Sequence, residues 1–482
     1  MKRIFSACIV FCFFCFLPVQ AQLDFEKFKQ AQIQQFDDFR QQKQLEFADF
    51  LEQKWAEFEV MSGKKRVEMP KPVDPPVVDP ERKKKTPPVE IPAAPEVMTI
   101  PQNLPKLPEL PVPKAPKDVT YTKTTVDFLG YKLNFNYDKR FNVELKGLYE
   151  EDIAKLWRTL AKASFEEVTY QCLLIKRELK LNDWGYYMFV KNLADRIYTP
   201  DKANEKTIFT AFILNDSGYR TRIARDKTYR EILLLLPIED QVYERRYVQV
   251  DGKNYYLMGN EQKSVYSYSN NWKDDNEKRT VSLTIEEPIN VSKPTETETV
   301  KNEVFGEGIR ITFNPNTKDF YAQMPSCDIS VPFNSECSAD VTASLQTQIG
   351  KRLEGKTPYE QVATLLNFMH QGFPYKTDFE QFGKEKFFFY EEAFEYPFTD
   401  CEDNAILFAY LVRKLTGLKV IGLIYSGHAA TAVNLGDNVD GAFVTFKGAK
   451  YTVCDPTYIG ASVGDCIPEY MNESPTVIEI KN

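Results

Sequence analysis

The sequence predicts an α+β protein with two globular blocks behind a helical N-terminal segment. Segments with helical periodicity and segments with strand-like alternation occur together in residues 121–280 and again in residues 346–482. A proline-rich stretch over residues 61–120 precedes both blocks. With 482 residues, the chain is too long for one typical domain and fits two or three.

The N-terminus has the pattern of a secretory signal over residues 1–21. Lys2 and Arg3 form its positive end, an apolar core follows, and "VQA" (Val19–Ala21) offers a cleavage site of small residues. The core is shorter than the ~20 residues that a membrane span needs. Its cysteines lack the position and the small preceding residues of a lipid-attachment site. We therefore expect an exported protein, periplasmic or secreted, with no membrane span in the mature chain.

Residues 22–60 contain an eleven-residue repeat. Its phenylalanines stand at positions 25, 36, 47 and 58 and again at 28, 39 and 50. Eleven residues make three helical turns of about 3.67 residues each, so these side chains form one nearly straight stripe. We expect one long amphipathic helix that packs within the chain, self-associates or binds a partner. Its mixed polar face argues against a membrane surface.

The proline-rich stretch predicts an extended, polyproline-like linker between this helix and the globular part. Its basic run, Lys83–Lys85, fits a solvated linker, and the net charge of −8 argues against a general nucleic-acid binder.

His370 and His428 are the only histidines, which excludes zinc sites built on several histidines. No metal and no organic cofactor is indicated.

Each block has an expected order of elements. The first has strand character in "FLGYKLNFNY", helices in "EEDIAKLWRTLAKAS" and "WGYYMFVKNLADRIY", a helix, turn and strand in "NEKTIFTAFILNDSGYRTRIA", and a hairpin in "YVQVDGKNYYLM". Asp251-Gly252 is the expected turn of that hairpin. Residues 281–345 alternate apolar and polar positions and predict a β-rich connecting segment. A capping box, "TPYE" (Thr357–Glu360), then starts a helix of the last block.

Six cysteines follow the signal, at positions 172, 327, 337, 401, 454 and 466. Some of them could pair in an oxidising compartment, and Cys327 with Cys337 is the plausible local bridge. Cys401 differs from a buried structural cysteine because it stands at the head of the apolar run "TDCEDNAILFAYLVRKL" rather than inside it. In the first turn of a helix, free backbone N–H groups and the helix dipole stabilise a thiolate. Thr399 or Asp400 is the expected N-cap.

A nucleophilic thiol needs a base to take its proton, and the next two strands offer one. His428 opens a strand on which Ala430 and Ala432 share its face, and these small side chains would let the thiol-bearing helix approach. In the following strand, "AKYTVCDPTYIG", Asp455 and the cysteine before it point to opposite faces, so Asp455 can orient the imidazole. A helix and two strands would then bring Cys401, His428 and Asp455 together.

These segments resemble the transglutaminase-like superfamily, including its exported bacterial members. The resemblance rests on "DCEDNAILFAYLVRKLTGLKV", "SGHAATAV" and "YTVCDPTY" and covers roughly residues 357–460. It implies a papain-like core in which Cys401 is the nucleophile, His428 the general base and acid, and Asp455 the orienting residue. The oxyanion hole would use the backbone N–H of Cys401 and one upstream donor, for which Tyr396 is the candidate.

The first block parallels the last in two places. "TIFTAFILNDSGYRTRIA" matches "AILFAYLVRKLTGLKVIGL", and "VDGKNYYLMG" matches "FKGAKYTVCD". We therefore expect two tandem transglutaminase-like copies. The first copy is degenerate, because Gly259 falls opposite Asp455, residues 202–204 fall opposite Cys401, and residues 121–280 contain no histidine.

The favoured function is an exported cysteine-dependent hydrolase or acyltransferase that acts on an amide bond of a protein or peptide through a thioester. Water as the acceptor would make it a peptidase or amidase, and an amine would make it a transferase. The alternative is a catalytically inactive binding or scaffold protein built on transglutaminase-like folds. The degenerate first copy and the phenylalanine helix favour that alternative.

Overall fold

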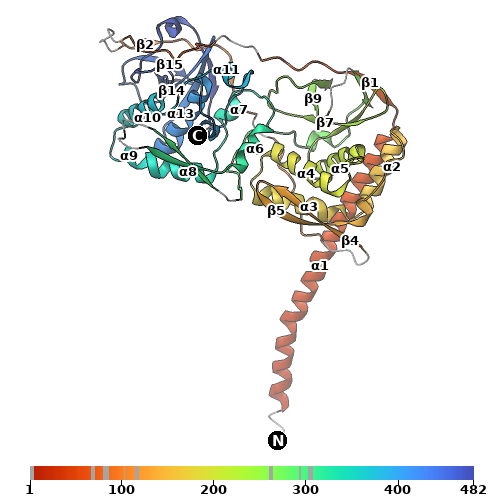
Figure 1. Cartoon of the computed structure of the whole chain (residues 1–482). Helices are drawn as coiled ribbons and strands as arrows, with labels where there is room; N and C mark the ends of the chain where they lie inside the picture. The colour runs from red at the N-terminus through yellow and green to blue at the C-terminus, as the bar shows by residue number, and fades with distance from the viewer. Residues whose placement is uncertain are drawn as a thin grey trace.

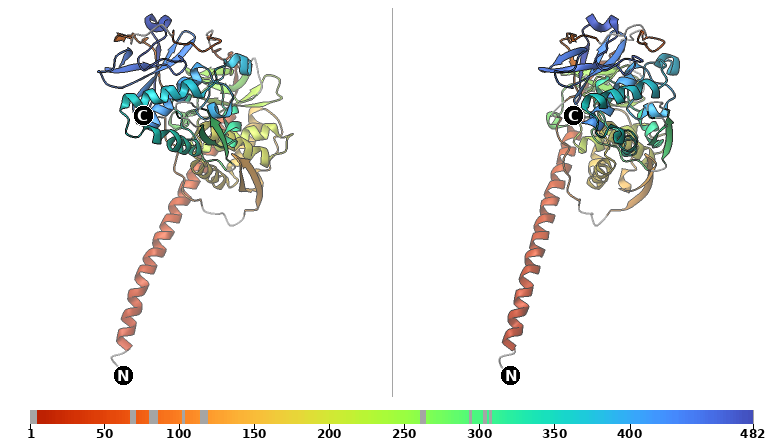
Figure 2. Two further views of the ribbon diagram at one scale, coloured as in Figure 1. Left: turned by 60° about the vertical axis from the view of Figure 1, so that its left-hand side comes forward. Right: turned by 90° about the vertical axis from the view of Figure 1, so that its left-hand side faces the viewer.

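The computed structural model describes residues 5–66, 71–79, 86–101, 104–113, 119–259, 264–292, 295–301, 305 and 308–481, with side chains from residue 26 onward. Helices and several separate sheets occur in both halves of the described chain, which confirms the α+β class. The two globular blocks lie side by side, and a long N-terminal helix projects from one of them (Figures 1 and 2).

Helix α1 (Phe5–Leu51) is one rod of 47 residues, and most of its length stands away from the body (Figure 1). Only its C-terminal part docks on the first block. There Phe47 is buried against Trp157, with the two ring centroids 4.9 Å apart. Phe28 and Phe39, earlier in the repeat, are exposed. The phenylalanine stripe therefore has an intramolecular partner over only part of its length.

The helix expected over residues 22–60 ends early, at Leu51. The indole N–H of Trp55 donates to the Leu51 carbonyl at 3.1 Å, and Trp55–Glu59 form strand β1, which pairs with β10 (Ser264–Tyr268). Residues 1–4 of the expected signal lie outside the described residues, and from Phe5 onward its backbone belongs to α1. Among the described residues, no helix combines the length and the apolar character that a membrane span requires.

The first block packs four helices against a six-stranded antiparallel sheet. The hairpin β4 (Tyr121–Phe128) and β5 (Tyr131–Asp138) precedes α2 (Glu150–Ala161), α3 (Phe165–Glu178), α4 (Asp183–Ile197) and α5 (Ala203–Asp216). The sheet follows with β6 (Arg222–Asp226), β7 (Ile232–Pro237), β8 (Tyr247–Val250) and β9 (Lys253–Leu257). Asp251 and Gly252 have φ values of 48° and 74°, as a two-residue hairpin turn of this type requires.

Residues 281–345 are less rich in strands than expected. They contain one hairpin, β11 (Glu296–Val300) and β12 (Ile309–Phe313), followed by helices α6 (Asn316–Ala322), α7 (Ser330–Phe333) and α8 (Ala339–Leu345). The short helices bury aromatic side chains, so tertiary packing rather than local pattern decides their conformation. Tyr321 stacks on Phe389 at 5.0 Å, which links this segment to the second block.

The second block packs helices on a seven-stranded sheet. Thr357 caps α10 (Pro358–Gly372) in the predicted box, and α13 (Cys401–Thr416) is buried almost throughout. The sheet order is β2-β15-β16-β14-β13-β17-β3, where the two edge strands are β2 (Val89–Glu90) and β3 (Val97–Met98). Its strands from β13 on are β13 (Val420–Tyr425), β14 (His428–Val433), β15 (Ala442–Phe446), β16 (Ala449–Cys454) and β17 (Thr476–Glu479).

Five consecutive strands have the same arrangement in both sheets. The first sheet contains β10-β6-β7-β9-β8 and the second β17-β13-β14-β16-β15, with every neighbouring pair antiparallel. In the first block the buried helix α5 comes directly before β6. In the second block the buried helix α13 comes directly before β13.

The proline-rich segment is not a free linker. Strand β2 (Val89–Glu90) extends one edge of the second sheet, and β3 (Val97–Met98) extends the opposite edge. Ile91 is fully buried there. The chain then returns to the first block, where the Pro105 carbonyl accepts a bond from Arg279 at 3.3 Å. Edge strands tolerate proline because one side of their backbone needs no partner. The basic run Lys83–Lys85 lies outside the described residues.

The expected bridge between Cys327 and Cys337 is absent, because both thiols are free and buried. The other four cysteines from Cys172 onward are also buried and form no disulfide.

We predict that Phe47→Ala lowers the free energy of unfolding by about 3–5 kcal/mol, because the residue fills an aromatic core. Phe28→Ala removes the same side chain from an exposed position of the same helix and should change stability by less than about 0.5 kcal/mol. Urea unfolding of the two variants measures the difference. Equal losses would contradict this docking of α1.

Candidate active site

Cys401 begins α13, and the local sequence fixes both ends of that helix. Asp400 is the N-cap: its side chain accepts from the N–H of Asp403, and the Asp403 carboxylate accepts from the N–H of Asp400 at 3.3 Å. Gly417 ends the helix in a left-handed conformation, with φ 72°. Because the first N–H groups of a helix have no partner within it, the Cys401 N–H is a possible oxyanion donor.

His428 and Asp455 form a buried pair. His428 follows a tight turn at Gly427, and its Nε2 lies 2.8 Å from Oδ2 of Asp455. The other carboxylate oxygen accepts from the N–H groups of Thr457 and Tyr458, at 3.0 and 3.1 Å, which fixes the orientation of the carboxylate. Burial alone would lower the pKa of His428, but the Asp455 carboxylate outweighs it and raises that pKa above its ordinary value.

The second ring nitrogen of His428 is unpaired. Nδ1 is buried and has no hydrogen-bond partner among the described residues. The ring lies parallel to Tyr470, with centroids 5.3 Å apart and planes at 5°. His428 therefore holds one nitrogen against a carboxylate and keeps the other for a further group.

Helix α13 packs on the face of the sheet opposite to the expected one. His428 pairs with Tyr425 in the register, and Ala430 and Ala432 belong to the core on that side. Ala429 and Val433, whose side chains point to the other face, share a core with α13 instead. The expectation that Ala430 and Ala432 admit the helix is therefore wrong. One position of strand alternation decides which face carries each side chain.

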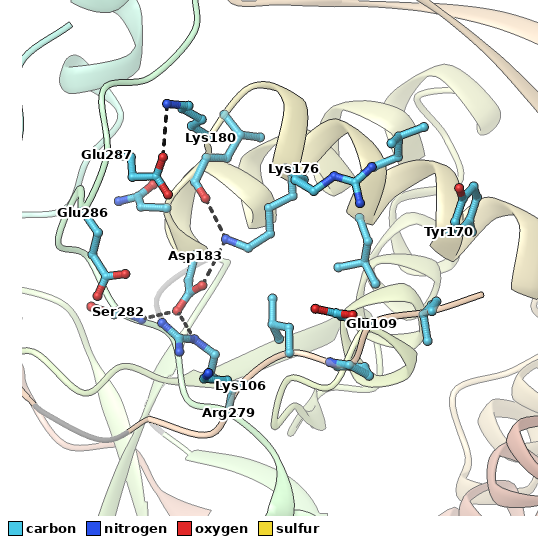
Figure 3. A pocket seen from close by; sticks show the side chains of 18 of the residues that line it. Lys106, Glu109, Tyr170, Lys176, Lys180, Asp183, Arg279, Ser282, Glu286 and Glu287 are labelled. Carbon is cyan, nitrogen blue, oxygen red and sulfur yellow. Dashed lines mark hydrogen bonds and ion pairs between the residues drawn. The ribbon is translucent and has the colours of Figure 1, made fainter. Parts of the chain in front are cut away.

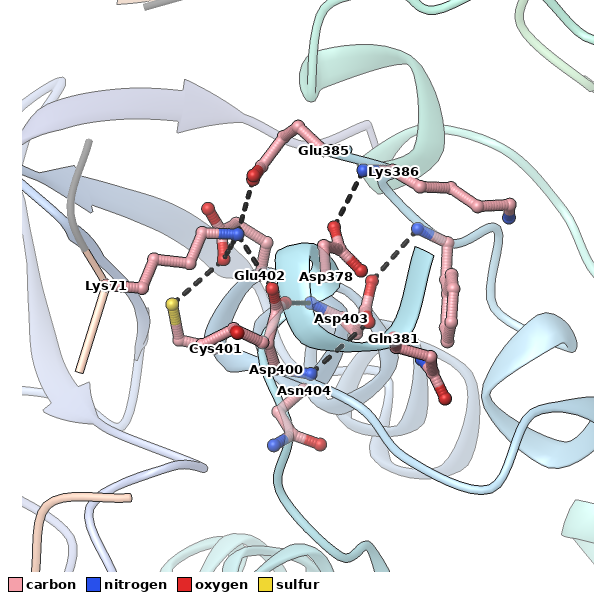
Figure 4. A network of polar contacts seen from close by, with 12 residues as sticks. Lys71, Asp378, Gln381, Glu385, Lys386, Asp400, Cys401, Glu402, Asp403 and Asn404 are labelled. Atoms are coloured by element: carbon pink, nitrogen blue, oxygen red, sulfur yellow. Dashed lines mark hydrogen bonds and ion pairs between the residues drawn. The ribbon is translucent and has the colours of Figure 1, made fainter. Parts of the chain in front are cut away.

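The thiol of Cys401 belongs to a separate, acidic network (Figure 4). Its Sγ donates to Oε2 of Glu402 at 2.9 Å, and the same oxygen accepts from Nζ of Lys71 at 2.8 Å. Lys71 also contacts Asp400, at 2.7 Å, and Glu385. Burial, Glu402 and Asp400 raise the pKa of the Cys401 thiol well above its usual range. Burial and these carboxylates thus favour the thiol over the thiolate, opposite in direction to the stabilisation expected from the helix N-terminus.

The thiol network and the histidine pair lie within electrostatic reach of each other. The carboxylate of Glu402 contributes to the raised pKa of His428, after the effects of burial and Asp455. Charge on Cys401 contributes to the raised pKa of Tyr470, after burial and Glu469. Cys401, His428 and Asp455 are all at most 3% exposed. The structure thus pairs His428 with Asp455 and bonds Cys401 to Glu402.

Tyr396, the candidate oxyanion donor, already has its backbone N–H bonded within the chain. Its backbone N–H donates to the Glu392 carbonyl at 3.0 Å, where it caps α12 (Glu392–Glu395). Its ring stacks on Phe388 at 5.0 Å and lies edge-on to Phe382. The residue belongs to an aromatic cluster.

His370 contacts the loop that carries Asp455. Its Nε2 lies 3.0 Å from the backbone carbonyl of Asp455 and so braces the loop that carries the carboxylate. Burial lowers the pKa of His370. No local motif around His370 indicates this contact, because the two residues are 85 positions apart.

Two groups of acidic side chains have the donor spacing of a cation site: Asp400, Cys401 and Glu402, and Asp378, Glu385 and Asp400, with donor atoms within 4.8 Å of one another. Oxygen donors of this kind suit hard cations. The ammonium of Lys71, however, already contacts three of the carboxylates. A resident metal therefore does not fit this arrangement of side chains.

A cavity of about 760 Å³ lies in the first block (Figure 3). At its polar end Asp183 accepts from Arg279 at 2.7 Å and lies 3.2 Å from Lys176. Although burial pushes the pKa of Asp183 upward, Lys176 and Arg279 outweigh it and hold that pKa below its ordinary value. The charges are paired within the cavity wall, and Cys401, His428 and Asp455 are not part of it.

No protein-family model, no curated protein and no solved structure matches this chain.

We predict that the two histidines titrate on opposite sides of about pH 6.5, the ordinary histidine pKa, with His428 above it and His370 below it. Asp455→Asn should lower the pKa of His428. Because a raised folded pKa stabilises the fold at low pH, the stability difference between wild type and variant should be full below about pH 6.5 and shrink as pH rises through the pKa of His428. NMR titration of the imidazole signals, assigned with His370→Gln, measures both pKa values. Unchanged titration of His428 in the variant would contradict the pairing.

Proposed function

We propose that this chain is an exported, transglutaminase-like cysteine hydrolase or acyltransferase that acts on amide bonds through a thioester. The observation that carries the proposal is the buried pair of His428 and Asp455, in which Nδ1 of the ring has no hydrogen-bond partner among the described residues. An imidazole oriented by a carboxylate and a thiol at a helix N-terminus are the two parts of a nucleophilic cysteine site.

In the proposed reaction, Nδ1 of His428 takes the proton of Cys401, and the thiolate attacks the carbonyl carbon of the amide. The oxygen of the tetrahedral intermediate is stabilised by the Cys401 N–H. The C–N bond then breaks as His428 returns the proton to the leaving amine, which leaves a thioester. Water or a second amine attacks that thioester and releases the acyl group and the thiol. Before the first step, the Cys401 thiol must leave its bond to Glu402.

The matching strand orders support the further proposal of two tandem copies of one papain-like core. Aligning β7 with β14 and β9 with β16 sets Ile232 opposite His428 and Met258 opposite Asp455. The residue opposite Asp455 is thus Met258 rather than Gly259. None of the side chains in these positions of the first copy can transfer a proton. The first copy would keep the fold without the chemistry.

A scaffold without turnover is the second candidate. The raised pKa of Cys401 and the exposed phenylalanines on α1 favour it. A protonated, buried thiol is a poor nucleophile until its surroundings change.

We predict that a peptidyl acyloxymethyl ketone labels one thiol per chain. Cys401→Ala should abolish the label, and His428→Ala should slow it by ~10²-fold or more, as the loss of a general base does. Cys172→Ala, a buried cysteine of the first block, serves as the control and should keep wild-type labelling. Mass spectrometry of the intact chain follows the rates. Equal rates in wild type and His428→Ala would favour the scaffold.

A further inference from the structure

Residues 71–79 form a strap that lies across the candidate site. At one end the carbonyl of Pro72 accepts from the hydroxyl of Tyr375 at 2.8 Å. At the other end Val78 donates to the carbonyl of Ile459 at 3.0 Å, four residues beyond Asp455. The strap thus touches both the thiol side and the carboxylate side of the site. Directly before the first anchor, the strap contributes one charged group to the interior, the ammonium of Lys71.

The ammonium of Lys71 lies in a pocket of carboxylates. Its side chain is 7% exposed, and its Nζ contacts Asp400, Glu402 and Glu385. Burial alone would lower the pKa of Lys71, but these carboxylates outweigh it and raise that pKa. Three negative groups around one nitrogen match the three N–H donors of an ammonium.

The pocket has more carboxyl groups than Lys71 contacts. Asp378, a fourth acid beside it, is buried, and its Oδ1 has no hydrogen-bond partner among the described residues. Its other oxygen accepts from the N–H of Lys386 at 2.7 Å. Burial raises the pKa of Asp378 to about 7. An unpaired carboxylate oxygen next to a bound ammonium is a position that a larger or second cationic group could use.

We propose that Asp378, Glu385, Asp400 and Glu402 form a subsite for a primary ammonium group of the substrate, such as a lysine side chain, and that Lys71 occupies this subsite as an internal competitor. This inference rests on the proposed function, because it assigns a substrate class to the same site. Glu402 accepts from both Lys71 and the Cys401 thiol, so a bound ammonium lies next to the nucleophile. A substrate amine that displaces Lys71 would also displace the strap and open the site.

The test separates ammonium binding from catalysis. We use the full chain with Cys401→Ala, which removes turnover, and compare it with the Cys401→Ala/Lys71→Ala double variant. The probe is n-pentylamine, with n-pentanol as its uncharged control, and calorimetry and thermal unfolding measure binding. Pentylamine should bind the double variant at least 10-fold more tightly than the Lys71-containing chain and should raise its unfolding temperature. Lys106→Ala, an exposed lysine of the same proline-rich segment, is the matched control and should not create binding.

Several outcomes would overturn the inference: equal binding with and without Lys71, equal binding of pentanol, no binding to the double variant, or stabilisation by calcium but not by pentylamine. Should Lys71→Ala fail to fold, Lys71→Met keeps the packing of the aliphatic stem and takes its place in the same comparison. In the Cys401-containing chain, Lys71→Met should slow iodoacetamide labelling of Cys401, because the charge of Lys71 lowers the pKa of the thiol, and pentylamine should restore the labelling. Amine binding without any acyl-probe labelling would refute the enzyme and leave the subsite standing.

Discussion

Buried negative charge at the start of α13 is the constraint around which the second block is organised. Asp400 and Asp403 cap the helix through their side chains, and Glu402 accepts the Cys401 thiol. Helix N-termini favour anions, but several buried carboxylates repel one another and each costs several kcal/mol to desolvate. They can persist only with bound protons or with a cation. Lys71 supplies that cation from more than 300 residues earlier in the chain.

This requirement explains why the proline-rich segment is ordered where it meets the second block. A free linker would have left the carboxylates without Lys71. Instead, the segment pairs with both edges of the second sheet, and its strap is anchored at Tyr375 and Ile459. Edge strands need covering in any sheet. The same residues therefore complete the fold and neutralise the site, so the two blocks are joined by structure as well as by covalent connection.

Local patterns predicted much of this architecture. The Asp251-Gly252 turn, the capping box at Thr357 and the helix that begins at Cys401 depend on neighbouring residues, and the structure contains all three. The failures depend on distant contacts. The end of α1 at Leu51 follows from pairing of β1 with β10, and the raised pKa of Cys401 follows first from its burial. A lysine in a proline-rich run gives no local sign that it will be buried among carboxylates. The face of β14 was misassigned because alternation specifies two faces without saying which one a helix covers.

For the proposed reaction, the structure leaves the base and the nucleophile in different states. The base is already formed: Asp455 holds the ring of His428, and His370 braces the loop behind it. The nucleophile is not, because Glu402 accepts the proton-bearing thiol and burial disfavours the thiolate. The difference between the closed form and a reactive one is then the position of one proton and one ammonium. Removing Lys71 from Glu402 alone would raise the pKa of the thiol further, since it would leave the carboxylates unneutralised. An incoming cation must therefore replace Lys71 rather than merely expel it, which couples opening of the site to the arrival of a charged group.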